Sequence, residues 1–328
     1  MRALVTGATG FIGSHIADTL YRRGFDVRCT YRSSSNLRWL KDKPYELIET
    51  TLFDFESLSE AVKNVDYIFH SGGQIAARNY DEYLKANRDG SLNLFKAAIA
   101  NAPALKRFVY ISSQTVAGPS QSLSQPYKES DLCHPITVYA KSKREAEIEL
   151  LKLQKELPLT IIRPSAVIGP RDTAILPLFN LGSKGILVLI GMGKKFLNLI
   201  HVKDLAESTV DAALSSNTTG NIYFIASEQP YSWNEIMDCI KKISKRKFSL
   251  KVKLPHFFVL SAAGAFQLYC KIINKVHPFN LDKGRDFIQK YWTCSVVQAK
   301  KDFGFCQKMS LEESLADTVN WYKENKWI

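Results

Sequence analysis

The chain has 328 residues, of which 45% are hydrophobic and 23% charged, so its composition excludes a disordered or fibrous protein. Its 44 basic and 32 acidic residues leave a net charge of +12, a sign that suits anionic partners. The basic residues are spread along the chain apart from short clusters such as Lys245-Arg246-Lys247, so we expect an anionic cofactor or substrate and no nucleic-acid interface.

Strands and helices alternate regularly through the first half of the chain. Short apolar strands separated by amphipathic helices indicate parallel βαβ units and hence a doubly wound sheet of the Rossmann type. The predicted strands are Arg2–Val5, Val27–Tyr31, Leu47–Thr50, Tyr67–His70, Phe108–Ser112 and Thr160–Arg163. The predicted helices include Ser14–Leu20, Leu58–Val65, Asn87–Ala100 and Ser142–Glu156.

The pattern becomes less regular after Arg163. Two more strands are predicted at Ile186–Ile190 and Ile222–Ile225, and helices dominate from Ser232 onward. We therefore expect a dinucleotide-binding Rossmann domain over 1–165, to which 195–228 returns. Residues 166–194 and 229–328 are predicted to form a smaller, mainly helical substrate-binding region.

A glycine-rich turn joins the first strand to the first helix. Glycines at such a turn let the backbone approach a pyrophosphate, and the N-terminus of the helix offers it free N–H groups. The residues expected to bind the cofactor here are Gly7, Thr9, Gly10, Phe11, Ile12 and Gly13.

The end of the second strand indicates which nicotinamide cofactor is bound. NAD-binding proteins of this fold place a carboxylate about 20 residues beyond the glycine turn, to hold the ribose 2′-hydroxyl. This chain has Tyr31-Arg32 there, and a guanidinium attracts a 2′-phosphate and stacks on adenine. Ser33 and Arg38 add further donors. We favour NADP(H), with NAD(H) as the alternative.

Two further segments are predicted to contact the cofactor. Asp54-Phe55 follows the third strand, where a carboxylate can accept a hydrogen bond from the adenine amino group. Ser71-Gly72-Gly73 follows the fourth strand, where glycines permit close approach of the backbone.

A tyrosine and a lysine four residues apart carry the predicted chemistry. Tyr139 and Lys143 share one helix face. An ammonium group beside a phenol favours the phenolate, so we expect the pKa of Tyr139 to be lowered toward the range of an acid–base catalyst. Ser113 ends the fifth strand, and its hydroxyl is expected to hold the same substrate oxygen. The predicted catalytic residues are therefore Ser113, Tyr139 and Lys143.

The chain resembles the extended short-chain dehydrogenase/reductase family, part of the NAD-dependent epimerase/dehydratase superfamily. The resemblance implies that Asn87, Pro164 and Val167 line the cofactor, that Lys143 binds the nicotinamide ribose, and that the protein is a homodimer. The matching motifs are Thr6-Gly7-x-x-Gly10-x-x-Gly13, Asp54, Asn87-x-x-Gly90-Ser91, Ser112-Ser113, Tyr139-x-x-x-Lys143, Arg163-Pro164 and His201-Val202-x-Asp204.

Smaller differences in sequence indicate which branch of the family, and hence which class of substrate, the chain resembles. Sugar-nucleotide enzymes of this family usually carry Arg-x-Phe-Asn, whereas this chain has Arg163-Pro164-Ser165-Ala166 and lacks the amide. Tyr31-Arg32 and Arg163-Pro164 look more like dihydroflavonol reductases and 3β-hydroxysteroid dehydrogenases. We expect an NADP(H)-dependent oxidoreductase that interconverts a ketone and a secondary alcohol on a fairly hydrophobic small molecule. The alternatives are an NAD-dependent sugar-nucleotide epimerase or dehydratase, and a non-catalytic NADP-binding protein.

The cysteines, the start of the chain and its most apolar stretch indicate the cellular compartment and the partners of the protein. The six cysteines show no C-x-x-C pair, no residue set has metal-ligand spacing, and the first strand begins beside Met1. We therefore expect reduced thiols, no metal, no signal peptide and a cytoplasmic location. The most apolar stretch, Phe257 to Cys270, is shorter than the roughly 20 residues that cross a bilayer. We expect a core or substrate-lining helix, with a weak membrane-surface contact as the alternative.

Overall fold

A seven-stranded, wholly parallel sheet forms the centre of the computed structural model, which describes residues 1–191, 193–245, 249–277 and 279–328. Its strand order is β3-β2-β1-β4-β5-β6-β11, so the order reverses between β1 and β4 and the sheet is doubly wound, as predicted. The strands are β1 (Arg2–Thr6), β2 (Asp26–Tyr31), β3 (Glu46–Glu49), β4 (Tyr67–His70), β5 (Arg107–Ile111), β6 (Leu159–Pro164) and β11 (Ile222–Ile225).

Each of these strands lies within one residue of its predicted ends. The central strands are buried throughout, since helices cover both faces of the sheet. One face carries α1 (Phe11–Arg22) and α7 (Val202–Leu214). The other face carries α2 (Phe55–Val62), α4 (Gly90–Asn101) and α5 (Val138–Lys152). The chain enters α4 through α3 (Tyr80–Tyr83) and the π-helical turn η1 (Leu84–Asp89).

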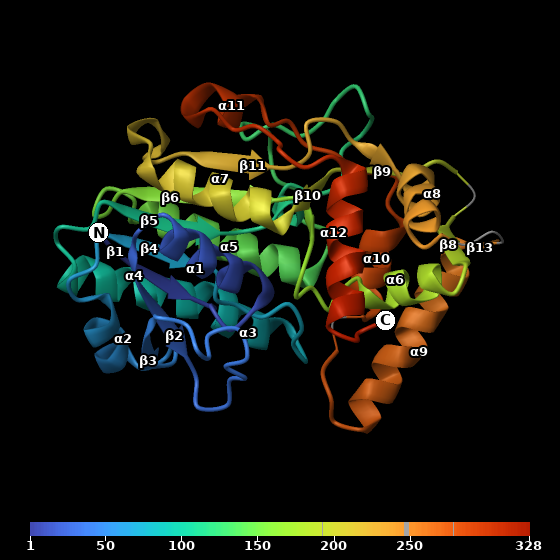
Figure 1. The fold of residues 1–328 in the computed structure, drawn as a ribbon. Coiled ribbons are helices and arrows are strands. Elements are labelled where there is room, and N and C mark those ends of the chain that lie inside the picture. The colour runs from blue at the N-terminus through green and yellow to red at the C-terminus, as the bar shows by residue number, and fades with distance from the viewer. Residues whose placement is uncertain (192, 246–248, 278) are drawn as a thin grey trace.

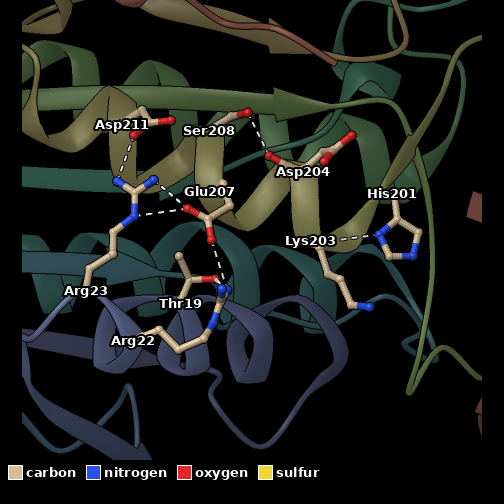
Figure 2. A network of polar contacts seen from close by, with 9 residues as sticks. All are labelled: Thr19, Arg22, Arg23, His201, Lys203, Asp204, Glu207, Ser208 and Asp211. Atoms are coloured by element: carbon tan, nitrogen blue, oxygen red, sulfur yellow. Dashed lines mark hydrogen bonds and ion pairs between the residues drawn. The ribbon is translucent and has the colours of Figure 1, made fainter. Parts of the chain in front are cut away.

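Helix α7 is fixed on α1 by a cluster of charged side chains (Figure 2). Arg22 and Arg23 of α1 both pair with Glu207, and Arg23 also reaches Asp211 at 2.7 Å. The ring of His201 caps α7 by accepting a hydrogen bond from the backbone N–H of Lys203. These contacts tie a late segment of the chain to the C-terminal end of its first helix.

The C-terminal region has its own hydrophobic core, which includes Phe179, Leu187, Ile236, Leu315 and Tyr322. Predicted strand Ile186–Ile190 forms β8, which pairs with β13 (Leu250–Leu254) in a separate two-stranded sheet. The other short strands are β7 (Ala166–Ile168), β9 (Phe196–Leu197), β10 (Leu199–His201), β12 (Tyr231–Ser232) and β14 (Tyr291–Trp292). The helices are α6 (Leu176–Ser183), α8 (Trp233–Ile243), α9 (His256–Ile272), α10 (Leu281–Ile288), α11 (Val297–Phe303) and α12 (Leu311–Glu324), with 3-10 turns at Gln114–Val116 and Ser216–Thr218.

Helix α9 corrects one expectation. It contains the apolar stretch from Phe257 to Cys270, yet only Val259, Ala263 and Cys270 are buried. It runs along the outside of the C-terminal region and is neither a core helix nor part of the cavity wall described below (Figure 1). Across the described ranges, no helix combines the length and the apolar character that a membrane span requires. Arg246 and Lys247 of the basic cluster lie outside the described residues.

Candidate active site

The glycine turn has the close backbone packing that a pyrophosphate site requires. Gly7 has φ +71°, and a Cβ there would lie 2.7 Å from the Ser71 carbonyl. A Cβ on Gly13 would lie 2.3 Å from the Gly7 carbonyl oxygen. Gly10 precedes α1, and no side chain of the described residues caps that helix end. The turn therefore presents uncapped N–H groups, together with Thr9, Phe11 and Ile12, and fits a dinucleotide.

Arg32 lies where a 2′-phosphate would need it. It is exposed, with Ser33, directly after Tyr31 at the end of β2, in a turn closed by the Ser35 hydroxyl. Its guanidinium has no ion-pair partner within the described ranges. Arg38 differs, because its guanidinium stacks 4.4 Å from the centroid of the Trp39 ring. Neither guanidinium has an ion-pair partner among the described residues, and only that of Arg38 is held against a ring.

Asp54 has a structural role that the sequence analysis did not assign. Its carboxylate accepts a hydrogen bond from the Ser57 N–H at 3.2 Å and so caps α2, with the exposed Phe55 as the first helical residue. This backbone hydrogen bond lowers the pKa of Asp54. An aspartate directly before a helical run is a known capping signal, which could have predicted this contact.

Asn87 ties the loop after β4 to the catalytic helix. It is fully buried, its Oδ1 accepts from the Gln74 N–H at 2.8 Å, and its Nδ2 donates to the Ser142 hydroxyl at 2.9 Å. A Cβ on Gly73 would lie 2.7 Å from Asn87 Oδ1, whereas Gly72 approaches the Thr6 and His70 side chains. The segment from Ser71 to Gly73 therefore packs closely beside the N-terminus of α5.

Ser113, Tyr139 and Lys143 come together at the carboxyl ends of β5 and β6. Thr137 caps α5, so Tyr139 lies in the first turn of the helix and Lys143 one turn later. Lys143 donates a hydrogen bond to the Ile111 carbonyl at 2.7 Å. The Ser113 hydroxyl hydrogen-bonds with the Tyr139 phenol and so lowers its pKa. The serine and the phenol can thus hold one substrate oxygen between them.

Burial governs the ionisation of this pair, which corrects the expected pKa of Tyr139. Burial raises that pKa to about 12, and the hydrogen bond with Ser113 only partly opposes the effect. Burial also lowers the pKa of Lys143 to about 7, while the Glu147 carboxylate opposes that shift. The lysine does not favour the phenolate here because its own charged form is disfavoured and its ammonium is directed at the Ile111 carbonyl. At neutral pH the phenol is therefore protonated.

A buried ion pair lies one helical turn beyond Lys143. Glu147, one turn beyond Lys143, accepts hydrogen bonds from Arg163 Nε at 2.9 Å and Nη2 at 2.7 Å. Both side chains are almost wholly inaccessible to solvent. The Arg163 guanidinium lowers the pKa of Glu147 against the opposing effect of burial. The pair fixes α5 on β6 and holds a negative charge near Lys143.

A cavity of about 360 Å³ opens beside the catalytic residues. Ile12, Ser113, Tyr139, Pro164 and Val167 line one wall, so the structure brings these five predicted residues together. The opposite wall comes from the C-terminal region and includes Phe196, Leu197, Trp233, Phe287 and Trp292. A mostly apolar chamber thus ends at the Ser113 and Tyr139 hydroxyls.

Four residues that line this cavity have a buried polar side-chain atom without a hydrogen-bond partner among the described residues. The atoms are Ser112 Oγ, Gln114 Nε2, Ser165 Oγ and Asp286 Oδ1, and each residue is more than nine-tenths buried. Burial raises the pKa of Asp286. Leaving such atoms unsatisfied is costly, so they are expected to meet polar groups of a bound molecule. Asp286 was not predicted, since nothing in its sequence neighbourhood signals contact with distant residues such as Ser113 and Tyr139.

The Rossmann sheet, the glycine turn and the serine–tyrosine–lysine arrangement define an NAD(P)-dependent oxidoreductase of the extended short-chain dehydrogenase/reductase type. A model of the NAD dependent epimerase/dehydratase family matches residues 3–226, and the chain belongs to that family.

Three known proteins illustrate how far the likeness extends. Ceramide reductase from Caulobacter vibrioides is 28% identical, over 99% of this chain and 95% of that protein. A 2-alkyl-3-oxoalkanoate reductase from Shewanella oneidensis is 25% identical, over 95% and 84% respectively. The solved structure of UDP-glucose 4-epimerase from Thermotoga maritima is 23% identical with a TM-score of 0.81, over 99% and 100%, which shows a shared fold.

Proposed function

We propose that this protein uses NADPH to reduce a ketone on a lipid-like molecule that has polar groups next to the carbonyl. The observation that carries the proposal is the largely apolar cavity that ends at the Ser113 and Tyr139 hydroxyls. Its aromatic far wall suits an alkyl chain. The unsatisfied polar atoms of Gln114, Ser165 and Asp286 suit a substrate with hydroxyl or amide groups near the ketone.

Each member of the site has a role in the reduction. The glycine turn would hold the pyrophosphate of a reduced nicotinamide dinucleotide, and this cofactor would supply the hydride for the carbonyl carbon. Ser113 donates a hydrogen bond to the carbonyl oxygen and polarises it. Tyr139, protonated at neutral pH, donates its proton to the oxygen as negative charge develops there. Lys143 would hold the cofactor ribose, and its protonated form would place positive charge near the phenol below its pKa of about 7. Reduction requires the protonated phenol, which is the form present at neutral pH.

Two observations support the choice of cofactor and substrate. Arg32 is exposed directly after β2, and the segment after β6 reads Ser165-Ala166 where sugar-nucleotide enzymes usually carry Phe-Asn, so Ala166 stands in place of the amide. Relatives that span nearly the whole chain are named ceramide reductase and 2-alkyl-3-oxoalkanoate reductase. Both names describe the reduction of molecules with alkyl chains.

The test compares nucleotides first and substrates second. Because a ligand that binds only the native state raises the melting temperature, NADPH is expected to give a larger shift than NADH. Oxidation of NADPH, followed at 340 nm, is then measured with three ketones of matched chain length. One carries a neighbouring hydroxyl and amide, one a neighbouring carboxylate, and one has no polar neighbour. UDP-glucose, with NAD, is the fourth substrate.

The ketone with hydroxyl and amide neighbours is expected to give the highest kcat/KM. The Asp286→Asn variant is expected to reduce that preference without changing the NADPH-induced thermal shift. Interconversion of UDP-sugars on a tightly retained NAD, with no ketone reduced, would overturn the proposal in favour of an epimerase.

A further inference from the structure

Helix α9 is apolar on two opposite stripes, and only one of them is covered. The covered stripe contains Val259, Ala263, Phe266 and Cys270, at steps of four and three residues. The uncovered side carries Phe257, Phe258, Leu268, Tyr269 and Ile272, whose exposed fractions run from 53% to 75%. A helix that is apolar all round is normally buried, so the outer face of α9 calls for a partner.

The covered stripe connects α9 to the cavity wall. Gly284 of α10 allows close packing, because a Cβ there would lie 3.1 Å from Ala263 Cβ. The Phe266 ring packs on Phe279 at a centroid distance of 6.0 Å, and Phe279 packs on Phe287 at 6.4 Å. Phe287 lines the cavity. The covered stripe of α9 is therefore linked to the wall of the substrate chamber through Phe279 and Phe287.

The sequence segment that contains α9 carries charge of one sign. From Cys239 to Leu281 the sequence contains no aspartate or glutamate and nine basic residues: Lys241, Lys242, Lys245, Arg246, Lys247, Lys251, Lys253, Lys271 and Lys275. This segment alone supplies most of the net charge of +12. Within the described ranges, Lys253, Lys271 and Lys275 have no ion-pair partner. Lys253 lies in β13, just before α9, whereas Lys271 lies in the last turn of α9 and Lys275 follows it, so basic residues stand at both ends of the helix.

From this combination we infer that the outer face of α9 binds the surface of an anionic lipid bilayer. The aromatic and aliphatic side chains enter the boundary between headgroups and acyl chains, and the lysines meet the anionic headgroups. A second copy of the chain fits this face less well. Its own unpaired lysines would lie against the lysines of the first copy, and like charges repel. The 17 residues of the helix do not span a bilayer, so the helix lies in the plane of the surface.

Surface binding gives the cavity access to a membrane-held substrate, a consequence that rests on the proposed function. The inference that α9 binds a membrane does not rest on the proposed function, because α9 and the lysines around it need neither cofactor nor substrate. The helix backs α10, which forms part of the cavity wall, so docking through α9 places the chamber beside the lipid.

The experiment measures binding of the full chain to vesicles. Vesicles of phosphatidylglycerol and phosphatidylcholine in equal parts are compared with vesicles of phosphatidylcholine alone, by co-sedimentation at low and high salt. The test variant is the triple substitution Phe257→Ser, Leu268→Ser and Ile272→Ser. The matched control is Leu132→Ser with Val297→Ser, which removes equally exposed apolar side chains (80% and 69%) elsewhere on the surface.

We expect the native chain and the control to bind the anionic vesicles, and binding to weaken with salt and without phosphatidylglycerol. The triple variant is expected to bind at least tenfold more weakly while melting at the native temperature. Failure of the native chain to bind, or equal binding by the triple variant, overturns the inference. So does a native dimer, seen by sedimentation, that the triple variant converts to a monomer with vesicle binding unchanged. If native chain binds vesicles but reduces no ketone, only the proposed function fails.

Discussion

Removing the charge of Glu147 is expected to destabilise the fold strongly. The Glu147→Gln substitution keeps the shape of the side chain but leaves Arg163, 1% exposed, without its counter-ion. It also loses one of the two hydrogen bonds, at 2.9 and 2.7 Å, that Arg163 makes to the carboxylate. Breaking a buried pair on one side costs about 3–5 kcal/mol. Total stabilities are about 5–15 kcal/mol, so the variant should fold but melt on the order of 10 °C lower.

The assay is thermal and urea unfolding of the native chain, of Glu147→Gln and of Glu149→Gln. Glu149 lies on the same helix and pairs with Lys152 at 2.7 Å, but that pair is partly exposed to solvent. Its loss is expected to cost no more than about 0.5 kcal/mol. If the two variants were destabilised equally, the argument that burial gives the Glu147–Arg163 pair its importance would be refuted.

Two other predictions concern the cofactor site. Arg32→Ala is expected to raise the KM for NADPH roughly 10- to 100-fold, because hydrogen bonds to a charged group contribute about 1.5–3 kcal/mol. The KM for NADH should hardly change. Because the Arg38 guanidinium stacks on Trp39, Arg38→Ala should leave the KM for both nucleotides unchanged. An equal rise in KM for NADPH and NADH in Arg32→Ala would count against a 2′-phosphate site. Lys143 acts as the ammonium and its pKa is about 7, so kcat/KM should fall as pH rises through that value. In Lys143→Arg the charge cannot be lost, so any activity that remains should not fall as pH rises. A pH profile like that of the native chain would assign the fall in kcat/KM to another group.

The sheet, the glycine turn before α1 and the helix that carries Tyr139 and Lys143 could be predicted from the sequence because their signals are local. Strands such as Tyr67–His70 are short apolar runs between helices, and burial on both faces fixes their ends. The glycine turn and the Tyr139–Lys143 spacing also lie within single segments. Asp54 follows β3, as predicted, but its cap on α2 was not recognised. An aspartate at this position fits both the start of a helix and a contact with a ligand.

The substrate half depends on contacts between distant segments. Asp286, Trp233 and Phe287 reach the cavity only after α8 and α10 pack around residues from β6 and β9. The ionisation of Tyr139 was predicted in the wrong direction because helix spacing shows that Lys143 is near but not how deeply both groups are buried. Helix α9 was expected in the core, since composition alone does not show which apolar face a neighbour covers.

The most direct test of this account measures turnover in Tyr139→Phe with NADPH and a long-chain ketone that carries a neighbouring hydroxyl and amide. General acid catalysis contributes about 100- to 10,000-fold, so the oxidation of NADPH at 340 nm should slow by at least the lower of these factors. The NADPH-induced rise in melting temperature should stay as in the native chain, because the phenyl ring preserves the packing. A variant that keeps the native kcat would show that the phenol does not deliver the proton, and would contradict the account.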